Sequence, residues 1–201
     1  MKNDYRYISD ILEFLKNDNF ILTLDELTKI IIKIRKQNKR VFIFGNGGSA
    51  TTAAHFQLDL SNKCSIKSMT YNLPETITCF ANDYGFNYSI KKYLEIYLEK
   101  NDLVILISSS GESSNMIEAA KFVKKTNKLI TLTGLNKNNR LSKIGLHNLY
   151  VNSKNYNVVE TIHLIFLLQV IESLYQELTI ILKTWNSSTT YLRISGKERS
   201  F

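Results

Sequence analysis

The sequence predicts an α/β fold, a three-layer sandwich in which a five-stranded parallel sheet lies between helices, with further helices at the N-terminus. Short apolar runs alternate with helical patterns, which is typical of parallel strands joined by right-handed crossovers. The runs that predict strands lie at 41–44, 68–72, 103–107, 129–133 and 149–151. Two of the strand-to-helix turns, 45–49 and 108–114, are rich in glycine or serine. Ligands bind at such turns in open α/β sheets.

The chain opens with two amphipathic helices. Helical spacing of Ile8, Ile11, Leu12 and Leu15 predicts the first helix over 5–17. Apolar residues repeat at the same spacing over 24–37, where Thr23-Leu24-Asp25-Glu26 fits a capping box. Between the strands, helices are expected at about 50–62, 88–98 and 113–125. The last helix is expected from Asn157 to about Lys183 and is apolar on most of its circumference.

Length and composition indicate one domain. A chain of 201 residues, 44% of them hydrophobic, can bury one substantial core. We therefore expect a single domain over 1–183 and a polar C-terminal tail over 184–201.

The expected location is cytoplasmic. The two cysteines, Cys64 and Cys79, form no disulfide framework in a chain of this length, and the first ten residues lack the apolar stretch of a secretory signal. The longest nearly uncharged apolar stretch, Thr161–Ile171, is too short to span a bilayer. No membrane association is expected.

The net charge of +8 does not by itself predict a nucleic-acid partner. The lysines are scattered, and basic groups such as Lys124-Lys125 occur where helices should end. No basic run is interleaved with aromatic residues that would stack on bases. An anionic small molecule is equally compatible with this charge.

The two unusual turns together predict a phosphate site. Glycines let a ligand approach the backbone, and the free N–H groups at a helix start favour an anion. The hydroxyl groups that would add donors belong to Ser108, Ser109, Ser110 and Ser113. Either turn alone is often only a tight connection or a helix cap. Neither turn fits the patterns G-x-G-x-x-G or G-x-x-x-x-G-K-[ST], which argues against NAD and ATP.

Five segments in this order resemble the sugar isomerase (SIS) domain, and within it the phosphoheptose isomerases: "FGNGGSATTAAHF", "ITCFANDYGF", "ISSSGESSNMIEAAK", "LITLTG" and "VVETIHLIFLLQVIESL". The resemblance covers roughly residues 5 to 178. It implies a flavodoxin-like strand order and a homotetramer with sites at subunit interfaces. It also implies interconversion of sedoheptulose 7-phosphate and the corresponding aldoheptose 7-phosphate, which supplies heptose for surface polysaccharide precursors.

The resemblance assigns roles to individual residues. Contacts to the sugar phosphate are implied for Asn46, Gly47, Gly48 and Ser49, and contacts to the sugar chain for Asn82 and Asp83. Phosphate binding is implied for Ser108, Ser109, Ser110 and Ser113. His55 and Asp59 fall at the positions of a histidine and a glutamate that serves as catalytic base and zinc ligand, and positions i and i+4 share one helix face.

The last helix departs from the family pattern. Where the family carries a glutamine and, two turns on, a histidine that acts as general acid and zinc ligand, this chain has Glu160 and Leu168. His55, Asp59 and Glu160 remain as three candidate ligands for Zn²⁺, and Glu160 is also a candidate substrate-binding residue. His163 shares a helix face with Glu160 and is either a substitute acid or a structural residue.

Two functions therefore stay open. The retained His55, Asp59 and "ANDYGF" favour an isomerase with Asp59 as the base. The loss of the acid at Leu168 favours a weakly active or inactive SIS module, which would bind sugar phosphates or a replication-initiator protein.

Overall fold

The computed structural model describes residues 5–16 and 18–194. Its sheet has five parallel strands in the order β2-β1-β3-β4-β5. The strands are β1 (Val41–Gly45), β2 (Ser68–Thr70), β3 (Leu103–Ser108), β4 (Lys128–Gly134) and β5 (His147–Val151). This is the flavodoxin-like order, so the predicted fold class is confirmed.

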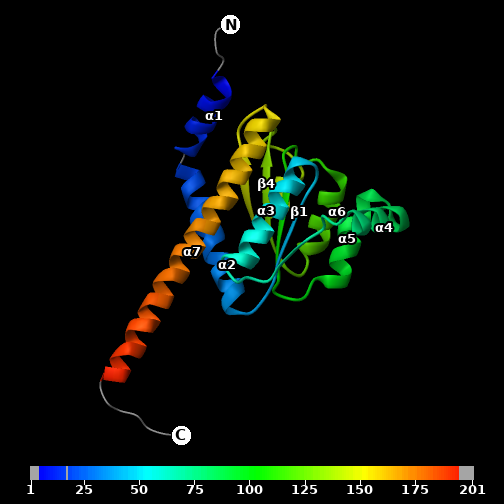
Figure 1. Ribbon diagram of the computed structural model, residues 1–201. Helices are drawn as coiled ribbons and strands as arrows, with labels where there is room; N and C mark the ends of the chain where they lie inside the picture. Colours follow the sequence, from blue (N-terminus) through cyan, green and yellow to red (C-terminus); the bar gives the residue numbers. More distant parts are fainter. Residues whose placement is uncertain (1–4, 17, 195–201) are drawn as a thin grey trace.

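Helices cover both faces of the sheet (Figure 1). One face carries α1 (Arg6–Leu15), α2 (Asp18–Lys36), α3 (Gly48–Asn62) and α7 (Tyr156–Ile194). The other carries α4 (Pro74–Tyr84), α5 (Phe86–Tyr97), α6 (Ser114–Val123) and the short 3₁₀ helix η1 (Leu141–Lys143).

The central strands are apolar on both sides, which is why their sequences read as continuous hydrophobic runs. On β3, Ile105 and Ile107 lie in the core beneath α3 and α7, whereas Val104 and Leu106 lie in the core beneath α5 and α6. All of β3 is buried. The sheet therefore holds the two predicted ligand turns on a rigid edge.

Some predicted boundaries are wrong. The second helix begins at Asp18, so Thr23 lies inside it and does not start it. Helix α4 was not predicted at all; none of its residues is fully buried, but Ile77 and Phe80 lie at helical spacing and pack partly buried against the core, so a short helical signal was missed. The last helix continues past Lys183 to Ile194, so most of the predicted polar tail is helical, while 195–201 lie outside the described residues.

Helix α7 has a longer apolar stretch than the sequence reading allowed. The segment Tyr156–Ile180 is long and apolar enough to cross a membrane by length and composition, with a mean hydropathy of 1.5. Half of its most apolar window is buried inside this fold. Since Val159, Ile162 and Phe166 belong to the core, this stretch has the character of a core helix.

Candidate functional site

The two predicted ligand turns lie next to each other at the carboxyl edge of the sheet. Strands β1 and β3 are neighbours, and Gly45 pairs with Ile107 at their ends. The Asn46 side chain crosses from the first turn to Asn115, in the first turn of α6, through two hydrogen bonds. Asn46 Nδ2 donates to Asn115 Oδ1 at 3.0 Å, and Asn115 Nδ2 donates to Asn46 Oδ1 at 2.9 Å. Sequence reasoning missed Asn115, because no spacing rule identifies a pair of amides 69 residues apart.

The predicted serines gather around the start of α6. The hydroxyl groups of Ser108 and Ser113 are 3.1 Å apart, and Ser108 Oγ also accepts the Gly111 N–H at 3.2 Å. Ser110 Oγ accepts the Glu112 N–H at 3.2 Å. Ser109 is buried, and its Oγ has no hydrogen-bond partner among the described residues. The turn thus gathers hydroxyl groups before a helix N-terminus, as an anion site requires.

A carboxylate follows this turn, and an arginine compensates its charge. Arg140 Nε donates to Glu112 Oε2 at 2.5 Å, and the Arg140 backbone N–H donates to Oε1 at 2.9 Å. These hydrogen bonds hold the pKa of Glu112 below its usual value. The acidic side chain therefore keeps a partner beside a turn predicted to bind phosphate.

The first turn fits tightly against the start of α7. Gly47 has a φ of 52°, a left-handed conformation that glycine adopts without strain. A Cβ atom on Gly48 would overlap the Glu160 carboxylate, so a larger residue at position 48 would displace the Glu160 side chain. Ser49, next along, is buried in α3.

An open hollow adjoins Glu160. Its volume is about 360 Å³, and its lining residues are Tyr7, Asn157, Glu160 and Thr161. The Tyr7 and Thr161 hydroxyl groups are 2.5 Å apart. Hydroxyl, amide and carboxylate groups suit the hydroxyl groups of a sugar, so this space is compatible with a polyhydroxy ligand.

His55 and Asp59 lie on one face of α3, as their spacing predicts. His55 Nε2 is 3.7 Å from Asp59 Oδ2, too far for a good hydrogen bond. Asp59 is buried, whereas about half of the His55 side chain is exposed. Lys63, one turn further on, donates to Asp59 Oδ2 at 3.0 Å, and this hydrogen bond raises the pKa of Lys63. Sequence reasoning missed Lys63, although its i+4 spacing from Asp59 was a usable signal.

Helices α3 and α7 run side by side from the ligand turns toward the opposite edge of the sheet (Figure 1). Gly48 faces Glu160 at one end, and Cys64 Sγ lies 4.0 Å from the Ile171 carbonyl oxygen at the other. Asp59 follows Gly48 by about 16 Å of helix. Within one chain, Glu160 therefore lies near the phosphate turns and Asp59 about three helical turns away from them.

The three candidate zinc ligands are not assembled in one chain. In the described part of the chain, no group of three histidine, cysteine, aspartate or glutamate side chains could hold a metal ion. The reason is the separation along α3: Glu160 lies against Gly48, while Asp59 is paired with Lys63. Within one chain, His55, Asp59 and Glu160 therefore do not converge on a common point that could hold a metal ion.

Asn82 and Asp83 lie apart from the other predicted residues. Both are exposed in the last turn of α4, where Asn82 Nδ2 donates to Asp83 Oδ1 at 3.1 Å. Helix α4 packs on α5, on the face of the sheet opposite α3 and α7. No hydrogen bond or ion pair among the described residues joins Asn82 or Asp83 to the α3 pair.

His163 is a buried structural residue. Its side chain is fully inaccessible, and its Nε2 lies 3.3 Å from the Thr133 carbonyl oxygen. Burial lowers the pKa of His163 to about 4, so the imidazole is neutral at physiological pH. Of the two roles left open by the sequence, the structure favours the structural one.

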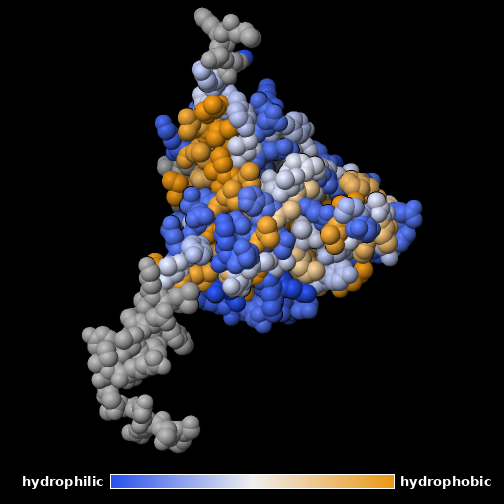
Figure 2. All heavy atoms as spheres, in the orientation of Figure 1, coloured by the Kyte–Doolittle hydropathy of each residue, from blue (hydrophilic) through white to orange (hydrophobic). Residues whose placement is uncertain are grey.

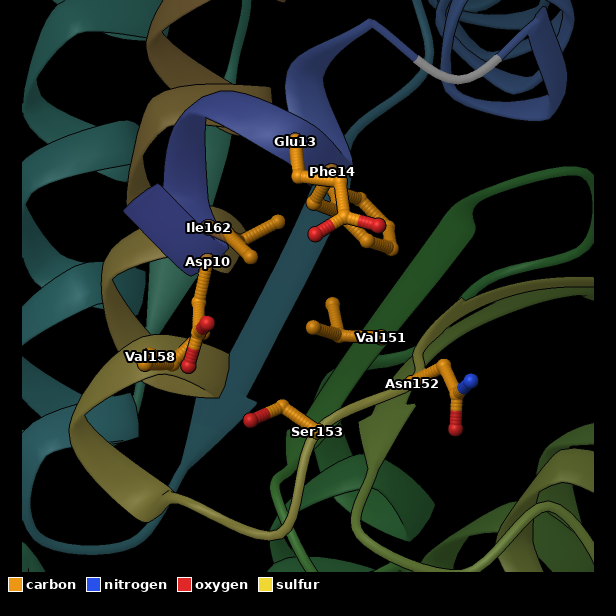
Figure 3. Close-up of a pocket in the computed structure, with 8 residues that line it drawn as sticks. All are labelled: Asp10, Glu13, Phe14, Val151, Asn152, Ser153, Val158 and Ile162. Carbon is orange, nitrogen blue, oxygen red and sulfur yellow. The ribbon is translucent and has the colours of Figure 1, made fainter. Parts of the chain in front are cut away.

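A separate cavity of about 350 Å³ lies between α1, the end of β5 and the start of α7 (Figure 3). Val151, Val158 and Ile162 line its apolar part, and the carboxylates of Asp10 and Glu13 face it from α1. Two carboxylates would repel a phosphate. This cavity therefore suits a phosphate less well than the serine turn does.

Comparison with known proteins gives consistent results. Residues 5–134 match the model of the SIS domain. The chain is 32% identical over 141 residues to a phosphoheptose isomerase of Vibrio vulnificus, covering 67% of this chain and 74% of that protein. It is 30% identical over 166 residues to a phosphoheptose isomerase of Fusobacterium nucleatum, covering 80% and 85%.

The fold is also similar to that of a solved phosphoheptose isomerase from Francisella tularensis, with a TM-score of 0.77. The two share 22% identity, and the match covers 85% of this chain and 93% of the other. This similarity confirms the architecture.

Proposed function

We propose that this chain, which belongs to the SIS domain family and within it to the phosphoheptose isomerases, catalyses the aldose–ketose isomerisation of a sugar phosphate. The proposed substrate is sedoheptulose 7-phosphate, converted to the corresponding aldoheptose 7-phosphate for heptose and surface polysaccharide synthesis. One observation carries the proposal: a hydroxyl-lined turn for phosphate occurs in the same fold as a buried carboxylate held by a lysine.

The proposed base is Asp59. An aldose–ketose isomerase needs a group that moves a proton between C1 and C2 of the sugar. The Asp59 carboxylate takes the proton from C1 of the ketose and returns it to C2. In the same reaction the C2 carbonyl oxygen gains a proton and the C1 hydroxyl loses one. We assign that second proton to His55, whose exposed side chain lies one turn from Asp59 on α3.

Lys63 supplies positive charge beside the base. Its ammonium group lies 3.0 Å from Asp59 Oδ2, and its raised pKa keeps it protonated. The enediolate intermediate carries negative charge on oxygen, and a fixed cation near that oxygen lowers its energy. We assign no step to zinc, because His55, Asp59 and Glu160 do not gather around one point. Zinc binding stays a prediction of the resemblance, to be checked by metal analysis of the purified protein.

We propose further that the protein is a homotetramer with its sites between subunits. In one chain, Asp59 is distant from the phosphate turn, and Asn82 and Asp83 are exposed on α4. An apolar patch covers the region of α1 and the adjoining part of α7 (Figure 2). Ile8 and Leu12 of α1 are 52% and 55% exposed, and Tyr5, just before this helix, is 62% exposed. Such a patch marks an interaction surface, and a second copy would bring its own residues to the site.

Light scattering tests the assembly. We expect a mass of four chains at micromolar concentration. A monomer would refute the tetramer. It would also remove the second copy whose residues we expect to complete the site.

Turnover of sedoheptulose 7-phosphate tests the function. NMR would follow the aldose product and the exchange of the C1 and C2 protons with deuterated solvent, with and without added zinc. Asp59→Asn should abolish exchange and leave sugar-phosphate binding intact. The amide keeps an acceptor for Lys63 and nearly the same volume, so folding should be retained. Absence of C1 and C2 proton exchange in the wild type would refute the proposed isomerase activity.

A binding module is the second candidate, and Leu168 is the observation that favours it. An aliphatic side chain cannot donate a proton to the sugar. Calorimetric binding of a sugar phosphate without proton exchange would support this candidate; the related proposal of a replication-initiator partner would need a pull-down with that protein.

A further inference from the structure

Asn115 connects the two ligand turns and has no role in the reaction proposed above. It is 1% exposed, and both polar atoms of its amide bond to Asn46. Its Oδ1 also accepts the Met116 N–H at 3.0 Å, which fixes the side chain relative to the first turn of α6. Asn115 is therefore held by α6 on one side and by the glycine turn on the other.

The amide pair makes the two turns one unit. Asn46 immediately precedes Gly47 and Gly48, whose backbone leads into α3. Ser113 and Ser114 immediately precede Asn115, at the start of α6. Because Asn115 is buried while Asn46 is only partly so, the Asn115 amide cannot exchange its partner for solvent without cost. A shift of the serine turn must therefore move the glycine turn.

The arrangement also limits what Asn46 does. Two of the hydrogen bonds open to its amide are used by Asn115, so at most one N–H and one acceptor position remain for a ligand. The implied contact of Asn46 with the sugar phosphate is then secondary to its contact with Asn115.

We propose that Asn115 is a positioning residue that fixes the glycine turn and Glu160 relative to the phosphate-binding serines. Glu160 enters this unit because its carboxylate lies directly against Gly48. A sugar phosphate held by the serines then meets Gly48 and Glu160 in one orientation. The inference rests on the proposed function, since it assigns the orientation of that substrate.

The test uses Asn115→Leu, which has a similar shape and cannot form the amide pair. The value of kcat/KM for sedoheptulose 7-phosphate should fall by about 10- to 100-fold, mostly through kcat, because misplacement of order 1 Å has such effects. The affinity for inorganic phosphate, measured by calorimetry, should stay close to that of the wild type, since all four serines remain. A general loss of structure would lower both.

Two controls separate positioning from stability. Asn46→Leu should lower kcat/KM at least as much as Asn115→Leu, because it also removes the secondary ligand contact, and the double variant should be no worse than Asn46→Leu, because the amide pair is already lost. Asn127→Leu removes another loop-bridging amide, which donates to the Glu99 and Asp102 carbonyl oxygens near the start of β3. It should destabilise the protein and leave kcat unchanged.

The outcomes are distinct from a failure of the proposed function. An active wild type with an equally active Asn115→Leu, or additive effects in the double variant, would overturn the role of Asn115. If the wild type does not convert sedoheptulose 7-phosphate, the proposed isomerase activity is refuted. The positioning role of Asn115 is then tested by binding alone: the wild type should bind the sugar phosphate more tightly than inorganic phosphate, and Asn115→Leu should lose that preference. If Asn115→Leu does not fold, Asn115→Asp serves instead, because it removes the donor to Asn46 Oδ1 at constant volume.

Discussion

Lowering the pH should destabilise this protein through a single buried imidazole. His163 is fully inaccessible, and its Nε2 lies 3.3 Å from the Thr133 carbonyl oxygen. In that tautomer a second proton must go to Nδ1, which has no hydrogen-bond partner in the part of the chain that the structure describes. Protonation would thus place an unpaired charge inside the core.

The magnitude follows from the pKa of His163, which burial lowers from 6.5 to about 4. As the pH falls below 6.5, the unfolded chain takes up the proton first, so the free energy of unfolding decreases until the pH passes below 4. The complete effect is about 3 kcal/mol. Between about pH 7.5 and pH 5, the loss should be about 2 kcal/mol.

Urea unfolding of the wild type and of His163→Gln at both pH values measures this loss in the free energy of unfolding. Glutamine can donate to the Thr133 carbonyl oxygen from a similar position and does not titrate. The variant should therefore lack the loss of about 2 kcal/mol in the free energy of unfolding between the two pH values. Protein concentration must be equal throughout, because assembly shifts apparent stability. An identical pH dependence in both proteins would refute the assignment. The kcat of His163→Gln should stay near that of the wild type. A loss of kcat with normal folding would instead support His163 as the general acid of the reaction.

Two further predictions concern the site. Ser110→Ala with Ser113→Ala should sharply weaken sugar-phosphate binding in calorimetry and leave the fold intact, because two hydroxyl donors leave the start of α6; unchanged affinity would exclude this turn as the phosphate site. Leu168→His should raise the turnover rate, since the loss of a general acid costs about 10²–10⁴-fold. If neither the wild type nor Leu168→His exchanges the C1 or C2 protons with deuterated solvent, the isomerase is excluded.

The fold could be predicted because its strands carry their own signal. The run Leu103–Ile107 is buried on both faces, and its length and flanking turns distinguish it from a helix. Helix α4 was not predicted, although Ile77 and Phe80 lie at helical spacing and pack partly buried against the core. A weaker signal was present: Pro74 occupies its first position and Glu75 its first turn, as is common at helix starts.

The site could be predicted only where its residues are close in sequence. The serines of the second turn and the His55–Asp59 pair are local patterns, and the structure brings each group together. The Asn46–Asn115 pair depends on strand order, which places two distant turns side by side. The distance between Glu160 and Asp59 depends on how α7 packs along α3, and no spacing within either helix contains that information.

The two departures from the family pattern, Leu168 and Asp59, lie on helices that pack against each other, α7 and α3. Leu168 lies in the part of α7 between the Glu160–Gly48 and Ile171–Cys64 contacts, as His55 and Asp59 do on α3. A leucine there removes a proton donor from the α7 side. Asp59 is shorter than the family glutamate, and Lys63 of its own helix holds it at 3.0 Å. The proposed base, its cation and the exposed imidazole are therefore concentrated on and just after α3. Helix α7 contributes Glu160 near the proposed phosphate turns and apolar packing through Phe166, Leu167 and Val170.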